Sequence, residues 1–184
     1  MGMAAPIYYT RDMLRDIPED GNRYELVRGE LLVTPAPRPW HEVVVARLQE
    51  NLTTYVRAFA PQLYVFGSRS EVSWGDQDTE VQPDAFVLPI EQVRTLDYEQ
   101  MRDLHLVVEV LSPSSRRYDR FTKRLEYQRR GVPCYWIVDP EEQLVEVWGP
   151  EDHFPRFEHQ RLLWQPAGAS RAFELELSEL FRPI

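Results

Sequence analysis

The chain of 184 residues contains a single lysine, Lys123, although it has 20 arginines. Arginine replaces lysine at most surface positions, but not where a compact point charge or a shifted pKa is needed. The lone lysine is therefore a candidate for chemistry. The alternative is that one lysine remained by chance.

Cysteine is equally scarce, because Cys134 has no second cysteine with which to form an internal disulfide. A reducing compartment is therefore favoured. No apolar run approaches the roughly 20 residues that span a bilayer, so no membrane partner is expected. The N-terminus lacks a basic start followed by an apolar stretch, which predicts no signal peptide. We expect a cytoplasmic protein.

Positive charge is in deficit overall, with a net charge of −9. This argues against a protein that coats nucleic acid, although an enzyme whose acidic site holds a metal ion is an exception. Residues 116–130 nevertheless hold seven basic side chains against two acidic ones. The segment is either a nucleic-acid contact or a solvated helix face. Four arginines are candidate contacts to backbone phosphates, which would bind nucleic acid without reading its sequence. They are Arg116, Arg117, Arg120 and Arg124.

The order of apolar patterns and breakers predicts an α/β fold, with a mixed central sheet flanked by helices. The length favours one domain over 1–184, with an N-terminal hairpin at 23–33, a core at 40–140 and C-terminal strands at 141–184. We expect helices at 9–16, 40–59 and 90–95, and a further long helix that ends at Gly131. Strands are expected at 64–74, 81–88, 104–111, 134–138 and 144–148, and the tail is expected to add edge strands that include 173–177.

Helical spacing places three polar or amphipathic side chains on one face of the last long helix, namely Asp119, Lys123 and Tyr127. The opposite face, with Tyr118, Phe121 and Leu125, is expected to pack on the sheet. Lys123 would then point away from the core, towards a cleft rim or bulk water.

Glu109 lies within the apolar run 106–111, which predicts a buried central strand. A buried carboxylate costs several kcal/mol unless it is paired or bound to a metal. The breaker sequence at 112–115 puts Glu109 near the C-terminal end of its strand, where open α/β sheets hold their sites. The alternative is a strand-end glutamate that reaches solvent or pairs with an arginine.

Asp84 follows Pro83 and enters an apolar strand. Adjacent strands would bring Asp84 and Glu109 together as a hard oxygen site suited to Mg²⁺ or Mn²⁺. Nothing suggests zinc, because the histidines are scattered and Cys134 has no neighbouring cysteine.

Four segments resemble the Uma2 family of restriction endonuclease-like proteins in their order and spacing. They are residues 24–31, the pair 83–84, residues 108–114 and residues 123–139, and the resemblance runs from about Arg23 to Pro140. It implies the restriction endonuclease-like fold of the PD-(D/E)XK superfamily. It also implies a metal-dependent endonuclease that hydrolyses phosphodiester bonds of nucleic acid, with DNA the expected substrate.

By this resemblance Asp84 and Glu109 ligate the metal, together with the main-chain carbonyl of Val110. The superfamily lysine is expected two residues after the glutamate, where Leu111 stands. Uma2-like sequences supply it from the next helix, which matches Lys123.

The resemblance also makes Glu25 and His41 candidate accessories, as a further metal ligand and as a water or phosphate contact. The alternatives are an exposed strand residue and a polar residue of a first helical turn. Asp119 is expected to orient Lys123.

Two other functions remain open. The fold could serve as a non-catalytic nucleic-acid or protein-interaction module, which the acidic charge favours. Asp84 and Glu109 could instead be the paired carboxylates of a glycosidase, which their separation and the absence of a metal requirement would reveal. An exposed strand edge in the tail makes a homodimer an expectation.

Overall fold

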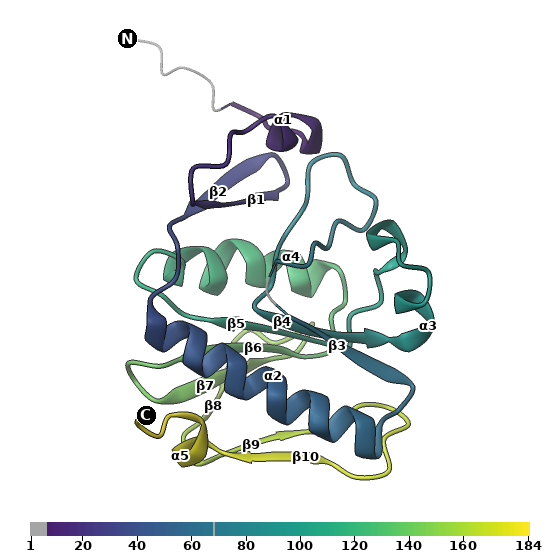
Figure 1. Cartoon of the computed structure of the whole chain (residues 1–184), viewed down its shortest axis with the longest axis vertical. Helices are drawn as coiled ribbons and strands as arrows, with labels where there is room; N and C mark the ends of the chain where they lie inside the picture. Colours follow the sequence, from purple (N-terminus) through teal and green to yellow (C-terminus); the bar gives the residue numbers. More distant parts are fainter. Residues whose placement is uncertain (1–6, 68) are drawn as a thin grey trace.

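A computed structural model describes residues 7–67 and 69–184. Its centre is a six-stranded sheet in the order β3-β4-β5-β6-β7-β8 (Figure 1). Strands β5 and β6 are parallel, and all the other neighbours are antiparallel. The mixed central sheet flanked by helices that the sequence predicts is confirmed.

Along the chain, groups of strands are separated by helices. The strands of the described residues are β1 (Arg23–Val27), β2 (Glu30–Thr34), β3 (Leu63–Gly67), β4 (Ala85–Pro89), β5 (Leu106–Val110), β6 (Tyr135–Asp139), β7 (Leu144–Trp148), β8 (Arg156–Glu158), β9 (Arg161–Trp164) and β10 (Phe173–Glu176). The helices are α1 (Arg11–Arg15), α2 (Pro39–Phe59), α3 (Ile90–Val93), the 3₁₀-helix η1 (Tyr98–Gln100), the π-helix η2 (Tyr118–Lys123), α4 (Arg124–Arg129) and α5 (Leu177–Leu180).

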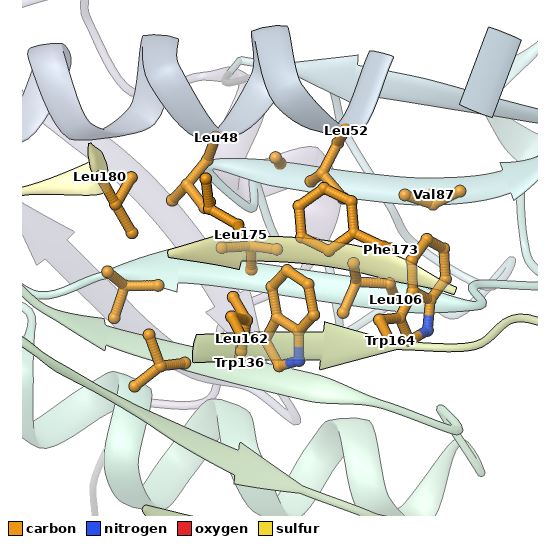
Figure 2. Close-up of a cluster of buried hydrophobic side chains, with 14 of the residues drawn as sticks. Leu48, Leu52, Val87, Leu106, Trp136, Leu162, Trp164, Phe173, Leu175 and Leu180 are labelled. Carbon is orange, nitrogen blue, oxygen red and sulfur yellow. The ribbon is translucent and has the colours of Figure 1, made fainter. Parts of the chain in front are cut away.

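One face of the sheet is covered by α2 and by the β9–β10 hairpin (Figure 1). Helix α2 begins with Pro39 in its first turn and buries a stripe at helical spacing. Figure 2 shows Leu48 and Leu52 of this stripe pointing towards Phe173 and Leu175 of β10, with Trp136 of β6 in the same core. This face is a continuous apolar core.

The opposite face is covered by the β1–β2 hairpin and by the segment that contains η2 and α4 (Figure 1). Its core includes Leu32 of the hairpin, Phe86 of β4, Val107 of β5 and Tyr127 of α4. Because both faces are covered, every residue of β5 is buried, as its apolar run predicts. A polar side chain on β5 is thus sealed beneath one cover or the other.

Most of the predicted elements lie where the sequence puts them, but three differ. The strand expected at 81–88 begins only at Ala85. The strand expected at 64–74 ends at Gly67, residue 68 lies outside the described residues, and Val72 forms only an isolated bridge with Val81. The tail adds one short edge strand, β8, to the central sheet. Strands β9 and β10 pair with each other instead, because their apolar residues pack on the α2 side of the sheet.

No helix among the described residues combines the length and the hydropathy that a membrane crossing requires.

Candidate active site

Two neighbouring strands bring the predicted carboxylates to one face of the sheet. Asp84 immediately precedes β4, and Ala85 pairs with Val108 of β5, next to Glu109. Side chains alternate along a strand, so Asp84 lies on the face of Phe86, and Glu109 lies on the face of Val107. Phe86 and Val107 share the core beneath η2 and α4. Both carboxylates therefore project to the side of the sheet that carries Lys123.

Lys123 lies at the centre of a buried group of carboxylates. Its Nζ is 2.8 Å from Oε1 of Glu25, 2.9 Å from Oε1 of Glu109 and 3.5 Å from Oδ1 of Asp119. The side chains of all four residues are about 1% exposed. The sole ammonium group of the chain thus meets carboxylates from a hairpin, a central strand and a helix.

The prediction for the faces of this helix is wrong in direction. Asp119, Lys123 and Tyr127 do share one face, but that face is buried on the sheet. Of the residues expected to pack there, Tyr118 does contact the core, whereas Phe121 is 59% and Leu125 52% exposed. The polar face turns inward because Lys123 pairs with buried carboxylates, so its desolvation is offset by charge. The turn that carries Lys123 is a π-helix, a rare form that is frequent at functional sites.

Asp84 is held by a separate set of partners. Its Oδ2 accepts a hydrogen bond from the Val110 backbone N–H at 2.8 Å and lies 3.2 Å from Nε2 of His41, and its Oδ1 lies 3.1 Å from Nη1 of Arg23. Burial would raise the pKa of Asp84, but the His41 hydrogen bond and the Arg23 charge outweigh burial and lower that pKa to about 2. Asp84 is therefore an ionised carboxylate, and Gln49 anchors its main-chain oxygen at 2.9 Å.

His41 occupies the first turn of α2 and is 7% exposed. Its other ring nitrogen, Nδ1, lies 3.2 Å from the Glu42 carboxylate. Burial would lower the pKa of His41, but the hydrogen bond to Asp84 outweighs it and raises that pKa. Helix α2 thus places the His41 imidazole beside the Asp84 carboxylate.

Glu109 and Asp119 are in the opposite electrostatic situation. Burial raises the pKa of Glu109 well above its usual value despite the charge of Lys123, and burial also raises the pKa of Asp119. Oε1 of Glu109 accepts hydrogen bonds from Lys123 and from the Tyr127 hydroxyl. Among the described residues, no group donates a hydrogen bond to Oε2 of Glu109 or to Oδ1 of Asp119. Two buried carboxylate oxygens therefore lack a hydrogen-bond partner.

The cluster as a whole has a surplus of acid. Four buried carboxylates, those of Glu25, Asp84, Glu109 and Asp119, face two permanent cations, Arg23 and Lys123. Within residues 7–67 and 69–184, no group of three or more His, Cys, Asp or Glu side chains is arranged to hold a metal ion. The two cations instead stand among the carboxylates. The surplus of carboxylates and the unpartnered Oε2 of Glu109 nevertheless offer oxygen donors of the kind that a hard cation takes.

The four arginines considered for phosphate binding are used differently. Arg116 lies 2.9 Å from Glu141, Arg120 lies 2.6 Å from Glu146, and Arg124 stacks 4.5 Å above the Trp148 ring. Arg117 is exposed and forms no ion pair with any described residue. The structure does not bring these arginines into the carboxylate cluster.

The sequence patterns did not identify two members of the cluster as site residues. Arg23 alternates with Glu25 along β1, so the two lie on one face of the hairpin, and this period-2 spacing was the signal that could have found Arg23. Tyr127 was placed on the face of Lys123, but its contact with Glu109 depends on the packing of α4 over β5.

Comparisons with known proteins agree with this architecture. A family model named Uma2, described as "Putative restriction endonuclease", matches residues 11–179. A solved structure from Anabaena variabilis, titled a "putative nuclease belonging to DUF820", aligns with a TM-score of 0.75 at 21% identity, covering 94% of this chain and 97% of its own. No curated protein matches the chain. The family model covers most of the sequence, and the chain belongs to the Uma2 family.

Proposed function

We propose that this protein is a divalent-cation-dependent endonuclease that hydrolyses phosphodiester bonds of nucleic acid, with DNA as the expected substrate. The observation that carries the proposal is the position of Lys123, which is buried among Glu25, Glu109 and Asp119. Glu109 belongs to β5, the neighbour of the strand β4 that Asp84 immediately precedes. A stable fold has no need of so costly a cluster, since apolar residues of similar volume fill such a space equally well. Membership of the Uma2 family supports the same reaction class.

Mg²⁺ or Mn²⁺ would be held by Asp84, Glu109 and the main-chain carbonyl of Val110. The Val110 N–H points to Asp84, and the C=O of a strand residue points to the same side as its N–H. The unpartnered Oε2 of Glu109 offers a further hard oxygen donor. When bound, such an ion supplies Lewis-acid chemistry: it neutralises phosphate charge and acidifies a water molecule.

Lys123 acts as a hydrogen-bond donor and a positive charge in this proposal. Burial would lower its pKa, but the carboxylates of Glu109, Glu25 and Asp119 outweigh burial and hold that pKa above its usual value. A lysine that stays protonated cannot take a proton from water. It orients the attacking water or stabilises the negative charge that develops on the phosphate oxygens.

The remaining residues hold the reacting groups in position. Glu25 and Asp119 flank the Lys123 ammonium, and Glu25 also accepts a hydrogen bond from the Gln82 backbone at 2.8 Å. His41 keeps Asp84 oriented or contacts a water or phosphate. Arg117 is the one of the four arginines that remains available to a backbone phosphate, because Arg116, Arg120 and Arg124 have intramolecular partners.

The test is cleavage of supercoiled plasmid and of single-stranded DNA with Mg²⁺, Mn²⁺ or EDTA. Asp84→Asn and Lys123→Gln remove one functional group each while roughly keeping side-chain size. Arg57→Gln is the matched control, because Arg57 is exposed in the last turn of α2, at the opposite end from His41. We expect cleavage that requires the metal, is lost in both site variants and persists in the control.

Each contrary result has a definite meaning. Cleavage that persists in EDTA, or in either site variant with circular dichroism like that of the wild type, refutes the proposal. Metal-independent binding without cleavage establishes the non-catalytic module instead. A homodimer remains a prediction of this function, because cutting both strands benefits from two sites, and light scattering coupled to size-exclusion chromatography measures it.

A further inference from the structure

Arg23 is the most exposed member of the buried cluster. Its side chain is 23% exposed, whereas those of Glu25, Asp84 and Lys123 are about 1% exposed. Among these residues, Arg23 is therefore the one that solvent reaches most readily.

Hydrogen bonds and ion pairs with four residues fix the position of the Arg23 guanidinium. Nη1 donates to the main-chain oxygen of Gln82 at 3.2 Å and to Oδ1 of Asp84 at 3.1 Å. Nε donates to Oγ1 of Thr34 at 3.4 Å and lies 3.6 Å from Oε2 of Glu25. Thr34 is the cross-strand partner of Arg23 in the hairpin, so the strand pairing itself fixes the side chain. The group is thus oriented before any ligand arrives.

One edge of this guanidinium remains unused. Nη2 donates no hydrogen bond to any residue that the structure describes, and it is not among the buried unsatisfied atoms. Nη2 therefore keeps some contact with solvent, and its N–H groups are free to donate to a ligand. A fixed guanidinium edge is the donor that proteins use for phosphate oxygens, because its planar fork matches their geometry.

We propose that Arg23 binds a non-bridging oxygen of the phosphodiester through the free Nη2 edge and positions that phosphate over Asp84. This inference rests on the proposed nuclease function and adds a substrate-binding residue to it. The role of Arg23 is then dual, since Nη1 and Nε secure the hairpin to Asp84 and Glu25 while Nη2 serves the substrate.

A purely structural role makes a different prediction for lysine at this position. A lysine would keep the positive charge beside Asp84 but would lose the planar fork. If Arg23 is only a counter-charge, Arg23→Lys restores every property. If Arg23 binds phosphate, Arg23→Lys keeps the affinity for the cation and still binds nucleic acid weakly.

The experiment measures binding instead of turnover. Calorimetry first gives the Ca²⁺ affinity of the full-length wild type, Arg23→Gln, Arg23→Lys and the control Arg57→Gln. Fluorescence anisotropy in saturating Ca²⁺ then gives the affinity for a labelled 16-base-pair DNA duplex at several salt concentrations, with gel electrophoresis to verify that the duplex stays intact. Thermal unfolding shows which variants fold.

We expect Arg23→Gln to weaken duplex binding about tenfold or more, the size of one charge-assisted hydrogen bond. The slope of log affinity against log salt should fall by about one. Arg23→Lys should bind Ca²⁺ like the wild type but the duplex more weakly, and Arg57→Gln should change neither affinity. If Arg23→Gln does not fold, Arg23→Lys alone decides.

Duplex affinity in Arg23→Lys equal to that of the wild type overturns the inference, and so does an equal loss in Arg23→Gln and Arg57→Gln. A wild type that binds the duplex through Arg23 but cuts no DNA in Mg²⁺ or Mn²⁺ refutes the nuclease and leaves the phosphate contact standing. A wild type that cuts DNA while the Arg23 variants bind normally removes only this inference. A wild type without duplex affinity removes both.

Discussion

The replacement Lys123→Ala should destabilise the protein strongly and in a pH-dependent way. The wild-type ammonium is 1% exposed and lies within 2.9 Å of both Glu25 and Glu109. Its removal leaves these two carboxylates and Asp119 facing one another in a region closed to water. A surface lysine replaced by alanine would change stability by less than about 0.5 kcal/mol.

The magnitude follows from the loss of one partner of a buried ion pair. Such a loss costs about 3–5 kcal/mol, because the remaining charge is left buried without compensation. For a chain of this length, that corresponds to a fall in Tm on the order of 10 °C. Part of the loss should return at low pH, because a buried carboxylate without its cation can take up a proton instead.

The measurement is urea unfolding of the metal-free wild type and Lys123→Ala at pH 7.5 and pH 5.5, followed by circular dichroism. We expect the difference in unfolding free energy to be larger at pH 7.5 than at pH 5.5. Added Mg²⁺ should raise the Tm of the variant more than that of the wild type. A Lys123→Ala protein within about 1 kcal/mol of the wild type at both pH values would refute the buried cluster.

Three further predictions concern other parts of the molecule. Burial raises the folded-state pKa of Glu109 and of Asp119 above their unfolded values, so the folded state binds more protons than the unfolded state. These two groups should therefore increase the unfolding free energy of the metal-free wild type as the pH falls from 8 towards 5. A continuous loss of unfolding free energy over this range in urea titrations would contradict this. Leu52→Ala should lower the free energy of unfolding by about 2–5 kcal/mol, because Leu52 is fully buried in the core. Leu163→Ala should lower it by less than about 1 kcal/mol, because this side chain is 48% exposed. Equal losses of the two variants in chemical denaturation would contradict the burial of Leu52. Burial raises the pKa of the Cys134 thiol to about 12, so a thiol-specific reagent at pH 8 should label the folded protein far more slowly than the unfolded one, and equal rates would contradict the burial.

Local sequence patterns were sufficient for most of the fold. The repeat of Val44, Leu48, Leu52 and Tyr55 predicts α2, and the structure buries all four. The apolar run around Glu109 predicts a central strand, and β5 is buried from end to end. These elements were predictable because hydrophobic spacing along the chain is the same whatever the partner element.

Features that depend on the partner were not predictable from spacing. An alternating segment such as β10 has one apolar face, but spacing does not say whether that face packs at the edge of the central sheet or across α2. For the helix that contains Lys123, spacing did not identify which face is buried. Apolar residues usually decide which face packs inward, yet here Phe121 and Leu125 face outward.

By itself, the sequence determined the chemical inventory and its placement along the chain. It singled out Lys123 by scarcity, Glu109 by an apolar context and Asp84 by the entry of a Pro-Asp pair into a strand. Only the tertiary structure decided that Lys123 turns inward to Glu25 and Glu109, and that Arg23 and His41 hold Asp84. The physical reason is that charge pairing acts through space between segments remote in sequence, whereas hydrophobic periodicity acts along each segment.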